Sequence, residues 1–320
     1  MKAAFISAYG SPDQITTGEL PIPEINSDEI LIKVHATSVN PVDWKIASGS
    51  MRRFLKIQFP YIPGADVSGV VEKTGSEVSK FKKGDEVFAF LDIVKAGACA
   101  QFVACKESLV AFKPRHITHE EASTIPLAGV TAIQALGKRK QDIKANDHYL
   151  ILGSAGGVGI LALQIVKAHG AFVTSVVSGS GMHLCNRLGA DDTIDYTKTD
   201  IRKIESRFDF IFDTTGKYNY FNLSHLLKKK GGVFVTTLPS FTTILAMILL
   251  SMLRIFRYKK KVSIVMAKPY LPDLEYAGRL ILSHKLNAVI DKMYSLSEIK
   301  EAWSHSIKGS VKGKIVVKIQ

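Results

Sequence analysis

Four glycines crowd one short stretch of the chain, ILGSAGGVGI at residues 151–160. The stretch follows the apolar run YLIL and opens the segment GGVGILALQIVKAHG, whose apolar residues recur at helical spacing. A glycine turn between a strand and a helix lets backbone amides approach a pyrophosphate at the helix N-terminus. The alternative is a flexible turn between two elements. The surrounding strand and helix patterns favour a dinucleotide-binding turn.

The residues after the next predicted strand bear on which dinucleotide is bound. That strand, AFVTSVVS, ends at Ser178, where an NAD site usually carries an Asp or Glu for the ribose hydroxyls. Residues 171–190 contain neither, and a small hydroxyl followed by glycine leaves room for a 2′-phosphate, so NADPH is favoured over NADH. Arg187 and Lys312 are candidate partners of that phosphate at a distance. Alternatively, Ser178 is the N-cap of the following helix.

Strands and helices alternate from about residue 120 onward. HYLILG, AFVTSVVS, DTIDY, FDFIFDTTG and GGVFVTTLP are predicted strands with helical patterns between them, which indicates βαβ units and a parallel sheet. Residues 1–115 instead contain short strand-like runs separated by turn residues, typical of an all-β unit. Turn-separated strands are predicted again over 289–320. We therefore expect an α/β domain between two parts of a β-rich domain.

The composition is that of a globular protein with a basic excess. Of 320 residues, 46% are hydrophobic and 22% charged, and the formal net charge is +13. The basic residues form short dispersed clusters without a nucleic-acid-binding motif, so no nucleic-acid partner is predicted. Three cysteines make no disulfide framework and fit a reducing cytoplasm. No signal-peptide layout and no apolar run of about 20 residues is found, so we expect a cytoplasmic protein.

Several motifs in the same order and at suitable separations resemble one family. The sequence resembles, over essentially the whole chain, the zinc-independent quinone oxidoreductase branch of the medium-chain dehydrogenase/reductase superfamily. The motifs are SVNPVDWKIASG (38–49), PYIPGADVSGVVEKTGSEV (60–78), FKKGDEVFAF (81–90), IPLAGVTAIQAL (125–136), GSAGGVG, LGADDTIDY (188–196) and the terminal GKIVV.

The resemblance implies an α/β protein of two domains. A GroES-like β-rich catalytic domain is expected at 1–115, completed by 287–320, and a Rossmann domain with a doubly wound parallel sheet at 116–286. The resemblance also implies a cleft between the two domains and, usually, a homodimer.

Metal binding is not predicted. Zinc-dependent relatives carry a Cys, a Gly-His-Glu and a second Cys where this sequence has Asn40, Ala65-Asp66 and Leu127. The cysteine quartet of the structural zinc lobe is also missing from the sequence. The pair His116-x-x-His119 has no matching Cys or carboxylate companions and is more typical of a surface turn.

The resemblance also implies which residues form the active site. Without zinc to polarise an alcohol, it implies hydride transfer from the nicotinamide to an acceptor that is already electrophilic. Asn40 and Trp44 would border the nicotinamide and the substrate. Ala155, Gly156, Gly157 and Val158 would hold the pyrophosphate, with Ser154 and Gly159 in the same turn. Further NADPH contacts would come from Thr131, Ser178, Tyr196, Thr214, Thr215, Gly216, Leu238 and Pro239.

Most of these residues also have a purely structural interpretation. Asn40-Pro41 could form a turn, Trp44 could be a core aromatic, and Tyr196 could close the end of its strand. Asp43 and Asp66 are more typical of hydrogen-bond anchors than of acids. No residue stands out as a general acid.

The segment FTTILAMILLSMLRIFRYKKK, 241–261, interrupts the strand–helix rhythm. It is apolar for most of its length, ends in a basic cluster, and is too short and interrupted to span a bilayer. Three interpretations remain open. The segment is a buried helix at the cleft or the dimer interface, an apolar lid over a lipophilic substrate, or a weak peripheral membrane contact whose lysines meet anionic headgroups.

Three functions remain open from the sequence. The leading hypothesis is an NADPH-dependent reductase of a small electrophilic acceptor, either a quinone or an α,β-unsaturated carbonyl. The second is a zinc-free NADP-linked dehydrogenase of another small carbonyl compound. The third is a cofactor-binding module without turnover, in which NADPH occupancy governs a partner through the basic surface.

Overall fold

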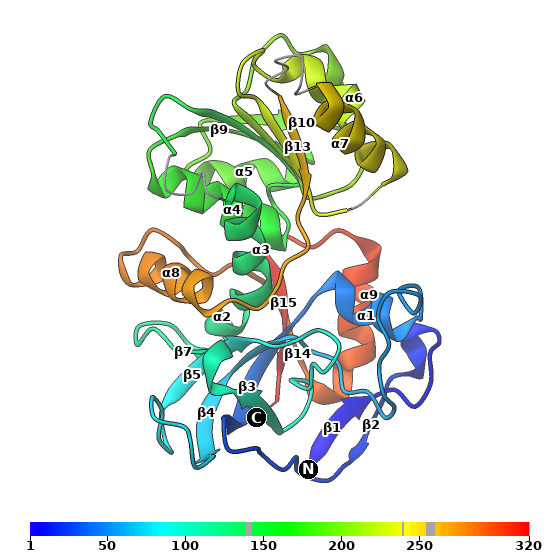
Figure 1. Cartoon of the computed structure of the whole chain (residues 1–320), viewed down its shortest axis with the longest axis vertical. Coiled ribbons are helices and arrows are strands. Elements are labelled where there is room, and N and C mark those ends of the chain that lie inside the picture. The colour runs from blue at the N-terminus through cyan, green and yellow to red at the C-terminus, as the bar shows by residue number, and fades with distance from the viewer. Residues whose placement is uncertain (138–142, 239, 254–259, 320) are drawn as a thin grey trace. The chain divides into compact units, whose positions relative to one another are not determined.

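The computed structural model describes residues 1–137, 143–238, 240–253 and 260–319. The chain forms two compact units, which are shown in Figure 1. Unit 1 comprises residues 1–130, 268–282 and 288–320, and unit 2 comprises residues 131–267 and 283–287. No helix in these described ranges is long and apolar enough to cross a membrane.

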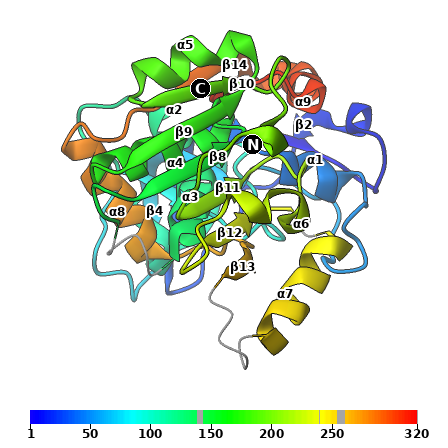
Figure 2. The ribbon, with the colours of Figure 1, turned by 90° about the horizontal axis from the view of Figure 1, so that it is seen from above.

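Unit 2 is built around a six-stranded parallel sheet with the order β10-β9-β8-β11-β12-β13, seen along its edge in Figure 2. The central strands are apolar and buried, as parallel strands are when helices cover both faces. Right-handed crossovers place α4 and α5 on one face and α6 and α7 on the other. The strands are β8 (His148–Leu152), β9 (Phe172–Val177), β10 (Asp192–Asp195), β11 (Phe210–Asp213), β12 (Val233–Thr236) and β13 (Lys261–Ile264). The helices are α4 (Gly157–Ala168), α5 (Gly179–Arg187), α6 (Tyr220–Leu223) and α7 (Phe241–Leu253), and α3 (Pro126–Leu136) runs from unit 1 into unit 2.

This topology confirms the predicted doubly wound sheet. The strand order reverses between β8 and β11, and open α/β sheets bind their ligands beyond the carboxyl ends of the strands at such a reversal. The segments that follow β8 and β11 are therefore the first place to look for a site.

Unit 1 contains a seven-stranded sheet and a separate two-stranded one. The larger sheet has the order β14-β15-β3-β4-β5-β7, with β6 also paired to β3, and its pairings are antiparallel except for β14 with β15. The strands are β1 (Lys2–Phe5), β2 (Thr16–Glu19), β3 (Glu29–Val39), β4 (Asp66–Thr74), β5 (Glu86–Phe90), β6 (Phe102–Lys106), β7 (Val110–Phe112), β14 (Ile290–Ser295) and β15 (Lys314–Lys318). The helices are α1 (Pro41–Ala47), α2 (His119–Ser123), α8 (Leu271–Leu282) and α9 (Ile299–Lys308).

The division between the units differs from the boundaries expected at 115/116 and 286/287. Helix α2 begins at a capping box in which Thr118 and Glu121 bond reciprocally, and it packs on β3 and β4 of unit 1. Helix α8 packs on β7, so residues 268–282 also belong to unit 1. Both helices are short segments whose packing partners lie far away in the sequence.

The prediction of turn-separated strands over 289–320 was wrong in its middle part. The residues between β14 and β15 form helix α9, which buries Ile299, Ala302 and Trp303. Their spacing of three and four residues is that of one helix face. The helical spacing was therefore present in the sequence, but the Val-rich strand that follows led to a prediction of strands for the whole segment.

Candidate active site

The glycine turn connects β8 to α4. Gly153 follows β8 in the left-handed region at φ 78°, which favours glycine. Gly156 is the N-cap of α4, and the helix begins at Gly157 as predicted. A methyl group at Gly159 would collide with the carbonyl of Gly153, so the helix packs directly on the turn. Glycine is therefore required for geometry at Gly153 and Gly159.

The start of α4 has the features of an anion site. Helix geometry leaves the amides of the first turn without intrahelical partners, and the macrodipole puts partial positive charge there. A methyl group at Gly156 would meet nothing closer than 3.4 Å within the chain, so there is free space beside these amides. Ser154 is buried and donates its hydroxyl to the carbonyl of Ile151 at 2.6 Å, which directs this side chain into the fold. Backbone amides of 157–159 could thus hold a pyrophosphate.

The loop after β11 lies against this turn. A methyl group at Gly153 would come within 2.6 Å of both Thr214 and Thr215, and Thr214 donates to the carbonyl of Leu152 at 2.8 Å. A methyl group at Gly216 would lie 2.6 Å from Leu238. Leu238 follows β12, so the segment after β12 lies beside the loop after β11. The structure thus gathers four residues predicted from the resemblance. Pro239 lies outside the described residues.

Asp213, which the sequence reading did not single out, organises this loop. One of its carboxylate oxygens accepts hydrogen bonds from the Thr215 amide at 2.8 Å, the Thr215 hydroxyl at 2.7 Å and the Gly216 amide at 3.1 Å. The other oxygen has no hydrogen-bond partner among the described residues, and the side chain is fully buried. Burial raises the pKa of Asp213. The Asp213 carboxyl group at the end of β11 therefore holds the Thr214–Gly216 loop in place by hydrogen bonds.

The ends of β9 and β10 form a second part of the site in unit 2. Ser178 is the N-cap of α5, but its side chain makes no capping bond and lies 3.4 Å from the Ser180 hydroxyl. Tyr196 follows β10, donates its amide to the carbonyl of Val177 at 3.0 Å, and is 39% exposed. The ammonium of Lys217 lies 4.5 Å from the centre of the Tyr196 ring. The structure thus places a cation beside Tyr196, from a loop that the sequence did not connect to it.

A carboxylate also lies near the end of β9. A methyl group at Gly179 would approach Asp195 to 2.8 Å. The Asp195 side chain is mostly buried and accepts bonds from the Thr197 amide and hydroxyl, and the hydroxyl bond is the main reason that the pKa of Asp195 is lowered. One oxygen of this carboxylate therefore bonds its own loop, while the other faces Gly179 at the start of α5. Asp195 lies outside residues 171–190, where the sequence has no carboxylate, because it belongs to the neighbouring strand β10.

The other predicted site residues belong to other elements of the chain. Arg187 is the last residue of the nine-residue helix α5, about 13 Å along the axis from Ser178. Thr131 is buried on α3. Lys312, Asn40 and Trp44 belong to unit 1.

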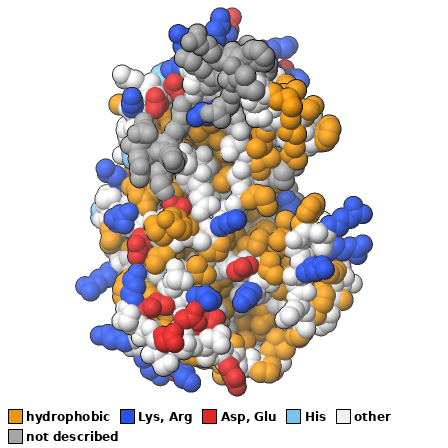
Figure 3. Space-filling view, in the orientation of Figure 1, with side chains coloured by type: hydrophobic (Ala, Val, Ile, Leu, Met, Phe, Trp, Pro, Cys, Tyr) orange, Lys and Arg blue, Asp and Glu red, His pale blue; other side chains and the backbone are white. Residues whose placement is uncertain are grey.

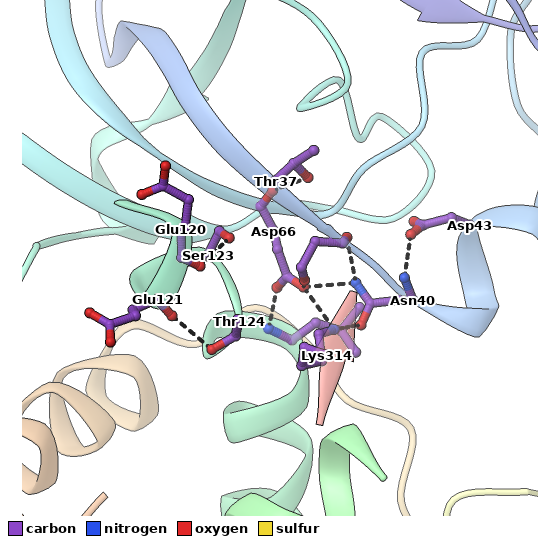
Figure 4. A network of polar contacts seen from close by, with 11 residues as sticks. Thr37, Asn40, Asp43, Asp66, Glu120, Glu121, Ser123, Thr124 and Lys314 are labelled. Carbon is purple, nitrogen blue, oxygen red and sulfur yellow. Dashed lines mark hydrogen bonds and ion pairs between the residues drawn. The ribbon is translucent and has the colours of Figure 1, made fainter. Parts of the chain in front are cut away.

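Unit 1 holds a buried polar network around Asp66, which Figure 4 shows from close by. One carboxylate oxygen of Asp66 accepts from the Leu127 amide at 2.6 Å, and the other accepts from the Asn40 side chain at 2.7 Å and from the Ser38 hydroxyl. The ammonium of Lys314 lies 3.3 Å from the second oxygen and also donates to the side-chain oxygen Oδ1 of Asn40. Asp66 and Lys314 are 0% and 5% exposed. This is an ion pair whose hydrogen-bonding capacity is largely satisfied inside the chain.

Asn40 and Trp44 both have structural partners. Asn40 is the N-cap of α1 with Pro41 at the first helical position, so the alternative of a plain turn was wrong. Its side-chain oxygen and nitrogen are both bonded within the Asp66 network. Trp44 is half-buried against a core cluster and donates its indole N–H to Ser306 at 3.1 Å. Asp43 accepts from the Asn40 amide at 2.8 Å, and burial raises the pKa of Asp43 to about 7.

These residues do not fit the zinc ion that dehydrogenase relatives bind. Zinc requires thiolate, imidazole or carboxylate ligands. Ala65 has no donor atom, Leu127 contributes an amide that bonds Asp66, and the Asp66 carboxylate already faces the Lys314 ammonium. Across the described ranges, no three His, Cys, Asp or Glu side chains are grouped for a metal.

His119 does not lie in a surface turn, contrary to the sequence expectation. Its ring stacks on His35 at 4.4 Å, one nitrogen lies 2.8 Å from the Ser68 hydroxyl, and burial lowers the pKa of His119 to about 4. The imidazole is therefore a neutral packing and hydrogen-bonding group on α2.

Comparisons with known proteins show the family and support the fold. The family described as alcohol dehydrogenase GroES-like domain matches residues 26–145. The family described as zinc-binding dehydrogenase matches residues 188–317, a range that does not include Asn40, Ala65 or Leu127. The chain is similar to the chloroplastic quinone-oxidoreductase homolog of Spinacia oleracea, with 32% identity over 333 aligned positions, covering 99% of this chain and 98% of the relative. It is 34% identical to the 2-methylene-furan-3-one reductase of Solanum lycopersicum over 332 positions, covering 99% of this chain and 79% of the relative.

A solved structure supports the same assignment. The quinone oxidoreductase from Coxiella burnetii is similar with a TM-score of 0.88 and 29% identity, covering 100% of this chain and 99% of that one. The chain therefore belongs to the quinone oxidoreductase branch of the medium-chain dehydrogenase/reductase superfamily and is an oxidoreductase that uses a nicotinamide cofactor.

Proposed function

We propose that this protein transfers a hydride from NADPH to a quinone or an α,β-unsaturated carbonyl without a metal ion. The observation that carries the proposal is the glycine turn opening α4 against the Thr214–Gly216 loop, at the reversal of strand order. The cofactor supplies the hydride when it is bound. The chain supplies binding and orientation.

Each part of the cofactor is assigned to residues of the chain. The amides at the start of α4 hold the pyrophosphate by hydrogen bonds and the helix dipole. Thr214, Thr215, Gly216 and Leu238 line the nicotinamide ribose, with the Asp213 carboxyl fixing the loop. Ser178 and Tyr196 contact the adenosine end. Thr131 and Lys312 are proposed as additional contacts, and Asn40 and Trp44 as residues that shape the acceptor site.

We propose that Lys217 binds the 2′-phosphate and makes the site selective for NADPH. Its ammonium lies beside Tyr196, whose amide bonds the carbonyl at the end of β9, and it brings a positive charge to the ends of β9 and β10. A charge-assisted bond contributes about 1.5–3 kcal/mol, so Lys217→Ala should weaken NADPH binding about 10- to 100-fold. NADH, which lacks the phosphate, should bind as before.

Titration of both cofactors by their fluorescence measures this difference. Lys144→Ala is the matched control because it removes one exposed lysine at the amino edge of the same sheet, before β8. Equal loss of NADPH and NADH affinity in Lys217→Ala, or no loss of either, would contradict the assignment.

The side chains around Asp66 support the proposed class of acceptor. Because these residues do not fit zinc, we infer that no metal ion there polarises an alcohol or an unactivated carbonyl. A quinone or an enone is electrophilic without such help. The names of two relatives point the same way, one to quinones and one to a 2-methylene-furan-3-one, which is an enone.

Consumption of NADPH by the purified, chelator-treated protein tests the proposal. A simple quinone, an enone and an unconjugated aldehyde are assayed side by side. We expect turnover of the quinone or the enone and none of the aldehyde. Turnover of the aldehyde alone would support the zinc-free dehydrogenase, and cofactor binding without any turnover would support a binding module.

A further inference from the structure

Helix α7 displays an unusual amount of apolar surface. Among its described side chains, Thr243, Ala246 and Leu250 are buried against α6 and β13. Seven large apolar side chains between Phe241 and Met252 are instead 37% to 80% exposed. Figure 2 shows α7 at the margin of its unit beyond β13, and Figure 3 shows apolar side chains gathered over it at the upper right. Exposed apolar surface of this extent marks an interaction site.

All the Asp, Glu, Lys and Arg positions in the sequence around α7 are occupied by Lys or Arg. Between Asp213 and Asp273 the chain has no Asp or Glu, while it has ten Lys and Arg. These are Lys217, Lys228, Lys229, Lys230, Arg254, Arg257, Lys259, Lys260, Lys261 and Lys268. A segment that combines exposed apolar side chains with charged residues that are all basic is complementary to an apolar layer bordered by negative charge.

The sheet register gathers basic residues near the end of α7. Strands β12 and β13 are parallel neighbours, with Val233 opposite Lys261 and the Lys261 amide bonded to the Gly232 carbonyl at 2.9 Å. Lys228–Lys230 precede β12, and Lys260 and Lys261 stand just before and at the start of β13, so these lysines lie at the same amino edge of the sheet. Helix α7 connects β12 back to β13, so its C-terminal end also lies at this edge. Lys229, Lys230 and Lys261 are exposed there.

The alternatives fit these observations less well. A two-fold dimer pairs the same surface patch of both copies, so a dimer through α7 would bring two strongly basic segments close together. The described helix has 13 residues and is about 20 Å long, shorter than the hydrocarbon core of about 30 Å. An interface between water and acyl chains accepts both the apolar helix and the lysines.

We propose that α7 is an interfacial helix that binds the surface of a bilayer containing anionic lipids. Its exposed apolar side chains enter the headgroup–acyl boundary, and the lysines at the amino edge of the sheet meet the negative headgroups. The proposal is independent of which acceptor the protein reduces.

Flotation of the purified full chain with lipid vesicles tests this. We expect it to float with vesicles of phosphatidylcholine mixed with phosphatidylserine at low salt, and not with phosphatidylcholine alone. Ile248→Gln/Met252→Gln removes apolar surface at two positions that are 49% and 59% exposed and should weaken binding at least about tenfold. Lys229→Gln/Lys230→Gln should weaken it about thirtyfold, since each lysine near an anionic surface contributes about 1 kcal/mol.

Two matched variants separate the patch from general effects. Phe54→Gln removes an apolar side chain that is 86% exposed in unit 1, and Arg52→Gln/Arg53→Gln removes the same charge as the lysine pair. Both should float like the unchanged protein. Failure of the unchanged protein to bind anionic vesicles at low salt would overturn the proposal. The proposal would also be overturned if the α7 variants dissociated an oligomer and floated like the unchanged protein, because a second copy of the chain would then cover α7.

Discussion

Gly157→Asp should abolish NADPH binding and leave the protein folded. Gly157 is the first residue of α4, where the amides are proposed to hold the pyrophosphate. A carboxylate about 4 Å from a phosphate oxygen costs about 4 kcal/mol at an effective dielectric constant of about 20, which is roughly a thousandfold in affinity. The fold should tolerate the change, because an acidic residue in the first turn of a helix interacts favourably with the helix dipole.

Cofactor titration and thermal unfolding of Gly157→Asp together separate binding from folding. Gly157→Asn is the matched control, since it adds nearly the same volume without the charge. We expect Asn to bind NADPH far more tightly than Asp, and both variants to unfold near the temperature of the unchanged protein. NADPH affinity retained in Gly157→Asp would show that the pyrophosphate lies elsewhere.

Asp66→Asn should lower the free energy of unfolding by about 3–5 kcal/mol, the usual result of leaving one member of a buried ion pair alone. In the native chain the Asp66 carboxylate accepts bonds from Asn40, Ser38 and Leu127 and faces the Lys314 ammonium. An amide at this position would direct its own N–H groups toward donors. Lys314 would then be buried with only the Asn40 oxygen as its acceptor.

Urea unfolding of a double-mutant cycle measures this coupling. Lys314→Met should cost less than Asp66→Asn, because the carboxylate keeps three hydrogen-bond donors. The double variant should cost clearly less than the sum of the two single changes. Additive effects would contradict a coupled ion pair and make Lys314 an independent packing residue.

The sequence was most informative where local pattern decides structure. The alternation of apolar strands and helices predicted the parallel sheet, and the glycines at 153–159 predicted the turn at β8 and the start of α4. Both depend on the conformational needs of neighbouring residues. The loop after β11 was predicted as part of the site only through the family resemblance, because nothing in the segment itself indicates a ligand, and its role as a cofactor site stays a prediction.

The sequence was least informative where contacts join distant segments. Lys314 reaches Asn40 across 274 positions, and Lys217 meets Tyr196 from a different loop. Asp195 approaches Gly179 from a neighbouring strand. Side chains of this kind are brought together by sheet order and register, which a reading of single segments does not determine.

Helix α7 shows a further limit. Its mostly apolar sequence was compatible with burial, a lid or a membrane surface, since composition alone does not say which face is covered. The structure buries only Thr243, Ala246 and Leu250 among its described side chains. The described part of the helix is therefore largely exposed on its own chain, and burial at a dimer interface, a lid and a membrane surface stay predictions.

The central claim is direct hydride transfer by a metal-free protein, and isotope transfer tests it most directly. The chelator-treated protein is given an enone and NADPH carrying deuterium at nicotinamide C4, once with each of the two C4 stereoisomers, and the reduced product is analysed by mass spectrometry. We predict that one of the two labelled cofactors delivers a single deuterium to the β-carbon of the product. A product that carries deuterium with neither cofactor, or that forms only when zinc is restored, would contradict the account.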